Sequence, residues 1–327
     1  MKLRILRSLL VSGLLLWSAS GVHATPVRVA YSAISGAMAP LWTAQDGGYF
    51  RREGLDVELL YIPGGSLLIQ AMIGGDVQFA FGPSVPVINA ALKGSDLALI
   101  ANTGNSLVFS IYSRPEIKAP QELKGKKIGV TRFAGSTDQA LDIALSKWAL
   151  QRGRDVTVLQ TGGMPESVAG LGAGLFDAVV LSPPNTLKAK KLGMRELVDV
   201  GQLGVAFPNT PLSASRSTLR ANRDMALRFL RGFALGLHRL RTDRAFSLKV
   251  LGRYTRTSDP EILHELYETY GVRYAGDPIP YVRLEGVEGI IGKIDSKEAR
   301  QARAADFIDH GPLKELEQAG FFRALSR

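Results

Sequence analysis

The 327-residue chain contains no cysteine. Without cysteine the protein cannot form disulfide bonds, bind zinc through thiolates or use a thiol nucleophile. A lipid anchor on a cysteine after a leader peptide is excluded for the same reason, so we do not expect a lipoprotein. The remaining composition, with 46% hydrophobic and 21% charged residues, is typical of a globular protein.

Histidine is scarce as well. Only His238, His264 and His310 follow the first 24 residues, and all three fall in predicted C-terminal helices or their connections. Histidine-based general-base catalysis and histidine metal sites are therefore not expected. His264 and Glu265 resemble the start of a zinc-protease motif, but no second histidine follows at the required spacing. We predict a protein that is not an enzyme and that has no metal or cofactor.

Long apolar runs are confined to the N-terminus. The basic start MKLRILR precedes the mostly apolar residues 8–17, and a small-residue cleavage site of the A-x-A type ends at Ala24. The apolar run is shorter than the ~20 residues that a membrane span requires, so a membrane anchor is the weaker alternative. These features predict a secretory signal peptide over residues 1–24, cleavage after Ala24 and a periplasmic mature protein.

The chain is basic, with 40 Lys and Arg against 30 Asp and Glu and a formal charge of +10, which falls to +7 without the three basic residues of the signal peptide. A basic protein can bind nucleic acid, but here the charge is scattered and the export signal argues against that function. In residues 223–244, the densest basic segment, the arginines lie largely off an apolar stripe. We interpret this segment as a solvated helix face and expect no nucleic-acid partner; docking to a partner or an acidic lipid is a minor alternative.

An internal repeat organises the chain. DVELLYIPGGS begins at Asp56 and DVTVLQTGGM begins 99 residues later at Asp155, while a second pair of phrases, at Asp76 and Asp177, lies 101 residues apart. Both copies alternate strands with helices, which indicates parallel βαβ units. The sequence therefore predicts two similar α/β lobes. We expect Asp76 and Asp177, each just before a strand, to make structural hydrogen bonds.

The second copy begins with KIGVTRFAGST, residues 127–137, which predicts a strand, a loop and the start of a helix. Ser136 and Thr137 are typical N-cap residues. Such a strand–loop–helix junction can hold an anion or a polar ligand. Apolar residues then recur at spacings of three and four, so we expect one helix face to be buried: Ala140, Leu141, Ala144, Leu145, Trp148 and Ala149.

Outside this stretch we predict a first helix over residues 39–52 and, after the Pro-rich break FPNTP, a returning strand over residues 212–219. The last hundred residues show no third copy of the repeat. They are predicted to form helices that pack on the first lobe and its hinge, over residues 222–243, 246–254, 260–270, 281–294 and 298–325.

Five phrases carry a family resemblance: GGYFRREGLDVEL, the Gly64-Gly65-Ser66 turn, IGGDVQFAFG, ELKGKKIGV with the Gly-Ser-Thr loop after it, and GLFDAVVLSPP. In this order, over about residues 27–219, they resemble the periplasmic solute-binding proteins of ABC importers. The most similar group handles nitrate, sulfonates, taurine and thiamine-pyrimidine precursors.

The resemblance implies an α/β fold with two lobes, of the type II periplasmic-binding-protein class, each lobe a mixed sheet flanked by helices. Residues 25–104 would form the first part of lobe I, residues 105–212 lobe II with its hinge strands, and residues 213–327 the return to lobe I with a helical C-terminal extension. By position, the two hinge crossings would be residues 103–112 and 206–213. The resemblance also implies a monomer that closes on one small-molecule solute. The transmembrane subunits of an ABC permease, served by a cytoplasmic ATPase, would then recognise the closed form.

Carried over to this chain, the ligand-facing loops contain Ser35, Gly36, Gly65, Ser66, Pro83, Ser84, Arg132, Phe133, Gly135, Ser136, Thr137, Gly163, Met164 and Pro183. These loops also follow predicted parallel strands, at the edge where open α/β sheets bind ligands. Arg132 is the one charged residue among them and could pair with a carboxylate or a sulfonate; the alternative is an exposed loop arginine. Phe133 and Tyr31 could form an apolar wall, with ordinary core packing as the alternative for Tyr31.

The predicted function is the solute-binding component of an ABC transporter for a small organic anion, such as a sulfonate or a carboxylate. Neutral or aromatic heterocycles remain open because the loops are otherwise uncharged. A non-catalytic ligand sensor and a pyrimidine-precursor enzyme of the same fold are the alternatives. Eukaryotic pyrimidine synthases of the thiamine pathway bear a Cys-rich motif, which this chain lacks.

Overall fold

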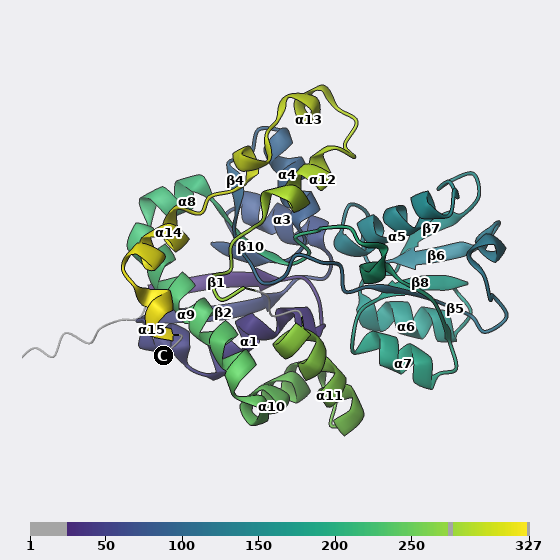
Figure 1. Cartoon of the computed structure of the whole chain (residues 1–327), viewed down its shortest axis with the longest axis horizontal. Helices are drawn as coiled ribbons and strands as arrows, with labels where there is room; N and C mark the ends of the chain where they lie inside the picture. The colour runs from purple at the N-terminus through teal and green to yellow at the C-terminus, as the bar shows by residue number, and fades with distance from the viewer. Residues whose placement is uncertain (1–24, 274–276, 326–327) are drawn as a thin grey trace, which may run out of the picture.

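The computed structural model describes residues 25–273 and 277–325. The predicted signal peptide and its cleavage site lie outside the described residues. Figure 1 shows two lobes side by side, with the teal lobe II on the right and lobe I, which carries the C-terminal helices, on the left. Each lobe is a five-stranded sheet flanked by helices, as predicted.

The sheet of lobe I has the strand order β2-β1-β3-β10-β4. Strand β1 pairs in parallel with β2 and β3, whereas β10 is antiparallel to both of its neighbours. Because β10 comes from far along the chain, the sheet is complete only after the chain has returned from lobe II. The strands are β1 (Thr25–Tyr31), β2 (Leu55–Tyr61), β3 (Phe79–Phe81), β4 (Leu97–Asn102) and β10 (Pro211–Ser215).

The sheet of lobe II repeats this arrangement, with the order β7-β6-β8-β5-β9. Here β6 pairs in parallel with β7 and β8, and β5 is the antiparallel strand. The same order in both sheets agrees with the repeat seen in the sequence. The strands are β5 (Ser110–Ser113), β6 (Lys127–Val130), β7 (Thr157–Gln160), β8 (Ala178–Leu181) and β9 (Arg195–Asp199).

The same type of hydrogen bond occurs at equivalent positions in the two lobes. The Lys127 N–H donates to the Asp177 carboxylate at 2.8 Å, as expected for a structural aspartate. In lobe I the equivalent acceptor is the Gln78 side chain, which takes the Arg28 N–H at 2.8 Å. The expectation for Asp76 was therefore wrong. An amide oxygen two residues later in the chain accepts the bond to the neighbouring strand.

Two segments connect the lobes, residues 103–109 between β4 and β5, and the segment that leads into β10. They lie against each other, because Ser106 and Ala206 form an antiparallel bridge and the Phe207 N–H donates to the Asn105 carbonyl at 3.0 Å. The hinge therefore consists of two paired strand-like segments.

Helices cover both sheets (Figure 1). In lobe I, α9 packs along α1 and buries Phe229 against Phe50 and Phe79. A glycine on α9 makes the approach of α1 possible, because a Cβ on Gly236 would lie 2.5 Å from the Cβ of Ala44. The helices up to α9 are α1 (Ala39–Asp46), α2 (Tyr49–Arg52), α3 (Gly65–Ile73), α4 (Ser84–Leu92), α5 (Ser136–Lys147), α6 (Met164–Gly172), α7 (Asn185–Lys191), α8 (Arg216–Ala221) and α9 (Arg223–Thr242).

The C-terminal helices pack mainly on lobe I, but some of their residues also contact lobe II. Asp259 and Glu261, at the start of α11, form ion pairs with Lys191 on α7 of lobe II. The C-terminal region therefore reaches across to the other lobe, which the sequence did not indicate. These elements are α10 (Arg244–Thr255), α11 (Pro260–Tyr267), the π-helix η4 (Glu268–Arg273), α12 (Leu284–Ile291), α13 (Lys297–Gln301), the 3-10 helix η5 (Ala304–Phe307), α14 (Gly311–Gln318) and α15 (Phe321–Leu325).

Several predicted boundaries were wrong for local reasons. The first helix is divided at Gly48, whose φ of +68° is left-handed. The returning strand ends at Ser215, because its hydroxyl accepts from the Thr218 N–H at 3.0 Å and starts α8 instead. Helix α5 ends before Trp148, which is half-buried and packs against the core. Ala149 is exposed with a φ of +54°, so it does not extend the buried face as predicted. In place of the single helix predicted over residues 298–325 there are three short α-helices, α13, α14 and α15, and the 3-10 helix η5.

Within the described ranges, no helix is both long enough and apolar enough to cross a membrane.

The stability of this fold should depend on pH through His310. Burial, and then the nearby Lys314, lower the pKa of His310 to about 4, and its Nε2 accepts the Val282 N–H at 3.0 Å. The unfolded chain, with a histidine pKa of about 6.5, binds a proton that the folded chain does not. The contribution of neutral His310 to the free energy of unfolding is therefore fully present above pH 6.5 and should decrease as the pH falls toward 4.

Urea unfolding at pH 7 and pH 5 measures this slope. The His310→Gln variant should show a smaller loss of unfolding free energy between the two pH values than the parent. His264→Gln, at an exposed histidine on α11, is the control and should keep the parental slope. An unchanged slope in His310→Gln would show that other groups set the pH dependence.

Candidate functional site

A small cavity of about 40 Å³ lies between the lobes, at the carboxyl ends of the parallel strands. Its walls come from the loops after β1, β2 and β3 of lobe I, from the loops after β6, β7 and β8 of lobe II, and from the hinge. The lining residues are Ser32, Ala33, Ser35, Ala37, Met38, Gly64, Gly65, Pro83, Phe109, Thr131, Ser136, Thr137, Met164, Ser182, Asn209, Thr210 and Tyr270.

Helix N-termini from both lobes converge on this cavity. Gly65 begins α3, Ser136 begins α5 and Met164 begins α6, and Pro83 is the N-cap of α4. The first turn of a helix carries unpaired N–H groups and partial positive charge. Among the described residues, no charged side chain lines the cavity. Backbone dipoles and hydroxyl groups therefore determine its polarity.

A hydroxyl cluster joins the lobes at one side of the cavity. The Ser35 hydroxyl lies 3.0 Å from the Ser182 hydroxyl of lobe II and 3.3 Å from the Tyr270 hydroxyl of η4. Tyr270 is fully buried, and burial raises its pKa to about 12, so the phenol stays protonated at neutral pH. Its ring packs on Gly36, where a Cβ would lie 2.2 Å from a ring carbon.

The lobes are in direct contact around the cavity. The Ser66 hydroxyl donates to the Phe133 carbonyl at 2.7 Å, and the Gly36 N–H donates to the Pro183 carbonyl at 3.5 Å. Arg132 of lobe II packs on Gly64 of lobe I, where a Cβ would lie 2.0 Å from the Arg132 Cγ. The structure is thus a closed form, because these contacts leave only a small cavity between the lobes.

The loop before α5 is held in a defined conformation. Ala134 has a left-handed φ of +58°, and its N–H donates to the Asp138 carboxylate at 2.7 Å. Arg152 in turn pairs with Asp138 at 2.5 Å. The Thr137 Oγ1 accepts the Thr131 N–H at 3.0 Å. These bonds orient the start of α5 toward the cavity.

The structure brings most of the predicted site residues to one place. Six of them line the cavity: Ser35, Gly65, Pro83, Ser136, Thr137 and Met164.

The other predicted residues lie beside the cavity, outside its lining. Gly36, Ser66, Arg132, Phe133 and Pro183 make the contacts between the lobes described above, and Ser84, Gly135 and Gly163 are chain neighbours of lining residues.

Arg132, Phe133 and Tyr31 lie in three different environments. The Arg132 Nε is buried and has no hydrogen-bond partner among the described residues, although the side chain does not line the cavity. Phe133 is 43% exposed at the surface. Tyr31 packs edge-on against Trp42, with ring centroids 5.9 Å apart, which is the core-packing alternative.

Sequence reasoning missed several lining residues, chiefly Ser182, Asn209 and Tyr270. Ser182 immediately precedes the predicted Pro183, so its place at the end of a strand was a usable signal. Asn209 follows the Pro-rich break and is buried with its side-chain oxygen unpaired in the described chain. Tyr270 comes from a region outside the repeat, and no local pattern indicated it.

The described residues contain no group of three or more His, Cys, Asp or Glu side chains placed to hold a metal ion.

Comparison with known proteins shows the family and the fold of the chain. YtlA of Bacillus subtilis (strain 168), provisionally named a binding protein, is 26% identical over 264 residues, which cover 78% of each chain. The periplasmic nitrate-binding protein NrtA of Synechocystis PCC 6803 has a similar structure, with a TM-score of 0.74 at 13% identity over 90% of this chain and 89% of NrtA.

The alkanesulfonate-binding protein SsuA of Xanthomonas axonopodis pv. citri, solved with bound MOPS, has a TM-score of 0.70 at 19% identity over 89% of this chain and 97% of SsuA. These similarities show the fold of periplasmic binding proteins. The sequence pattern described as NMT1/THI5 like matches residues 36–243, more than half of the chain. The protein is therefore a member of the NMT1/THI5-like family.

Proposed function

We propose that this protein is the extracytoplasmic solute-binding component of an ABC importer, and that it captures a small organic anion between its lobes. The observation that carries the proposal is the convergence of helix N-termini from both lobes on one cavity without a carboxylate. Each helix N-terminus favours an anion by roughly 0.3–1 kcal/mol, and the surrounding hydroxyls can donate to its oxygens.

Hinge closure is the proposed mechanism. A solute that touches both lobes stabilises the closed form by its higher affinity for that form. The contacts of Ser35 with Ser182 and of Ser66 with Phe133 show how closely the loops meet when the lobes close. The permease would then recognise the closed shape.

The structural neighbours support an anionic solute, since SsuA and NrtA are named for an alkanesulfonate and for nitrate. Relatives named as binding proteins favour a protein without catalytic activity. We propose that the mature protein is periplasmic and acts as a monomer. A ligand sensor remains the second candidate, because the same cleft would serve a membrane receptor. Solute uptake by cells that lack the protein separates the two functions, since only an importer component is needed for uptake.

Thermal-shift screening of the purified mature protein tests the solute class. Sulfonates, carboxylates, nitrate and pyrimidines form the panel. We expect at least one organic anion to raise the melting temperature in a concentration-dependent manner. If only a pyrimidine stabilises the protein, the anion assignment is wrong and the pyrimidine-precursor alternative gains support.

The role of Arg132 is tested separately. Arg132→Ala should weaken binding of the stabilising anion at least tenfold, or about 1.4 kcal/mol, if the guanidinium turns toward the solute when it binds. Arg154→Ala, on an exposed arginine of lobe II that pairs with Asp155, is the control and should bind normally. Unchanged affinity in Arg132→Ala would remove this residue from the site and leave the helix N-termini as the anion-binding groups.

A further inference from the structure

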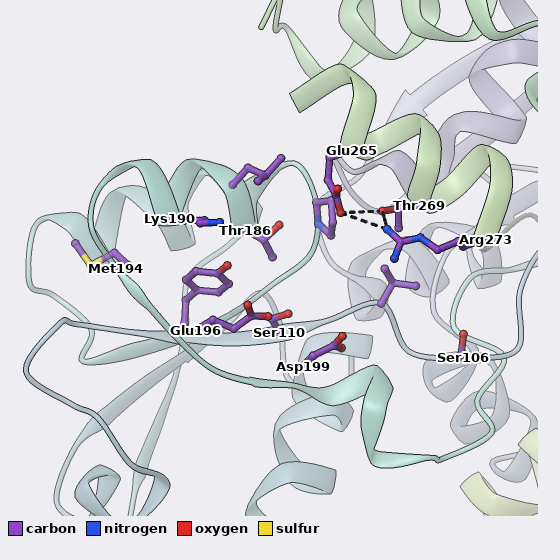
Figure 2. Close-up of a pocket in the computed structure, with 14 residues that line it drawn as sticks. Ser106, Ser110, Thr186, Lys190, Met194, Glu196, Asp199, Glu265, Thr269 and Arg273 are labelled. Atoms are coloured by element: carbon purple, nitrogen blue, oxygen red, sulfur yellow. Dashed lines mark hydrogen bonds and ion pairs between the residues drawn. The ribbon is translucent and has the colours of Figure 1, made fainter. Parts of the chain in front are cut away.

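A second and much larger cavity, of about 550 Å³, has a lining residue, Pro183, next in the chain to Ser182 of the first cavity. Figure 2 shows the side chains that line this second cavity. Its floor is one face of β5 and β9 with the hinge segment before β5, one wall is α7, and the opposite wall is α11 with η4. No described residue lines both cavities. The lining residues are Ser106, Val108, Ser110, Tyr112, Pro183, Thr186, Leu187, Lys190, Met194, Glu196, Asp199, Glu265, Thr269 and Arg273.

The position of these residues in the sequence explains the shape. Residues 106, 108, 110 and 112 alternate along an extended segment and therefore face one side of it. Glu265, Thr269 and Arg273 are four residues apart and form one face of the helices opposite. Each lobe thus contributes one continuous face to the cavity. Lys191 bridges from α7 to Glu261 on α11 at 3.2 Å, so the walls are held together in the closed form.

Buried polar groups line this cavity without internal partners. Ser110 and Thr186 are only 9% and 8% exposed, and no described residue hydrogen-bonds to either hydroxyl. A sheet face that is covered by its own protein is normally apolar, because buried polar groups need partners. These two hydroxyls therefore face the space between β5 and α7 with their hydrogen-bonding capacity unused by the protein, and a polar ligand there can bond to both.

The charges of the cavity indicate the sign of that molecule. Three carboxylates and two cationic side chains line it, although the chain as a whole is basic. Arg273 is engaged with the opposite wall, since it pairs with Glu265 at 3.5 Å and donates to the Thr269 hydroxyl at 3.2 Å (Figure 2). Glu196 forms no ion pair with any described residue. Lys190 is exposed and forms none either, so it can turn to solvent.

The environment of Glu196 shows that its charge is felt inside the cavity. Tyr112 lies opposite it across the β5–β9 pair, and burial followed by the Glu196 charge raises the pKa of Tyr112 to about 12. The phenol is thus neutral at physiological pH, and its ring offers a face for a cation near the carboxylate.

We propose that this cavity is a second ligand site that binds a small organic cation of the primary ammonium class. Glu196 on lobe II supplies the unpaired negative charge, and Glu265 on lobe I, which also pairs with Arg273, supplies a second carboxylate. The Ser110 and Thr186 hydroxyls accept hydrogen bonds from the ammonium group. Because the two carboxylates belong to different lobes, an occupied site favours the closed form. The site is distinct from the anion cleft, from which the contact of Gly36 with Pro183 separates it.

Calorimetric titration of the mature protein with butylammonium and with 1,4-diaminobutane tests the proposal, and butan-1-ol serves as the uncharged counterpart. We expect saturable binding of the amines, weakened by raising the salt concentration from 20 to about 150 mM because charged groups are screened, and no binding of the alcohol. Glu196→Gln and Glu265→Gln should each weaken amine binding at least tenfold. Glu298→Gln, an exposed carboxylate on α13 outside the cavity, should bind amines like the parent.

Two results would overturn the proposal. One is no saturable binding of either amine, or equal affinity in Glu196→Gln and Glu298→Gln. The other is a tenfold loss of amine affinity in the cleft variant Ser136→Ala, which would place the amine in the anion cleft. The affinity of Glu196→Gln for the stabilising anion is measured as well and should equal that of the parent. This measurement tests the anion cleft alone, so a failure of the anion proposal can be told apart from a failure of the amine proposal.

Discussion

Replacement of Gly64 by alanine should weaken binding of the cleft anion about a hundredfold, or about 2.8 kcal/mol, while both lobes stay folded. A Cβ at this position would lie 2.0 Å from the Arg132 Cγ and 2.9 Å from its Cβ, and these atoms belong to the opposite lobe. The clash therefore exists only when the lobes are closed. Overpacking of this kind typically costs 1–3 kcal/mol, and here it destabilises the closed form alone.

Gly75 provides a matched control at the other end of α3. It has a φ of +81°, similar to the +79° of Gly64, but nothing lies within 4 Å of its Cβ position. Gly75→Ala therefore adds backbone strain without a contact between lobes. Calorimetry with the anion that gives the largest thermal shift, together with the radius of gyration from solution scattering, measures affinity and closure. Equal affinities of the two variants would show that the lobes do not approach at Gly64 when solute is bound.

Replacement of Phe229 by alanine should lower the unfolding free energy of the mature protein by about 3–5 kcal/mol. Phe229 on α9 is fully buried between two other rings, with centroid distances of 4.9 Å to Phe50 and 4.1 Å to Phe79. Its removal leaves a cavity that joins a helix to the centre of the lobe I sheet. Neither neighbouring ring can fill it without abandoning the other contacts of α2 or β3.

Urea unfolding measures this loss. Leu175→Ala is the control, because the Leu175 side chain is 65% exposed and its truncation should change the unfolding free energy by less than about 0.5 kcal/mol. A loss below about 1.5 kcal/mol in Phe229→Ala would mean that the lobe I core can repack around the missing ring.

The candidate site was partly accessible from the sequence. Gly65, Ser136 and Met164 could be predicted because each follows a predicted parallel strand and begins a helix, and local sequence patterns indicate both features. The same reasoning selected Arg132 and Phe133, which share the loop but do not line the cavity. Loop membership indicates which backbone approaches the cleft. It does not indicate where a long side chain on that loop will lie, because its direction depends on the contacts across the closed cleft.

The sequence by itself determined the two α/β lobes and the loops that meet between them. These features depend on hydrophobic periodicity and on glycine and serine at strand ends, all within about thirty residues. Only the tertiary structure decided that Ser182 and Tyr270 meet Ser35, because these contacts join residues 147 and 235 positions apart. It also decided that β5, β9 and α11 enclose a second cavity. No local pattern encodes which faces of distant elements will be opposite one another, since that depends on how the whole chain packs.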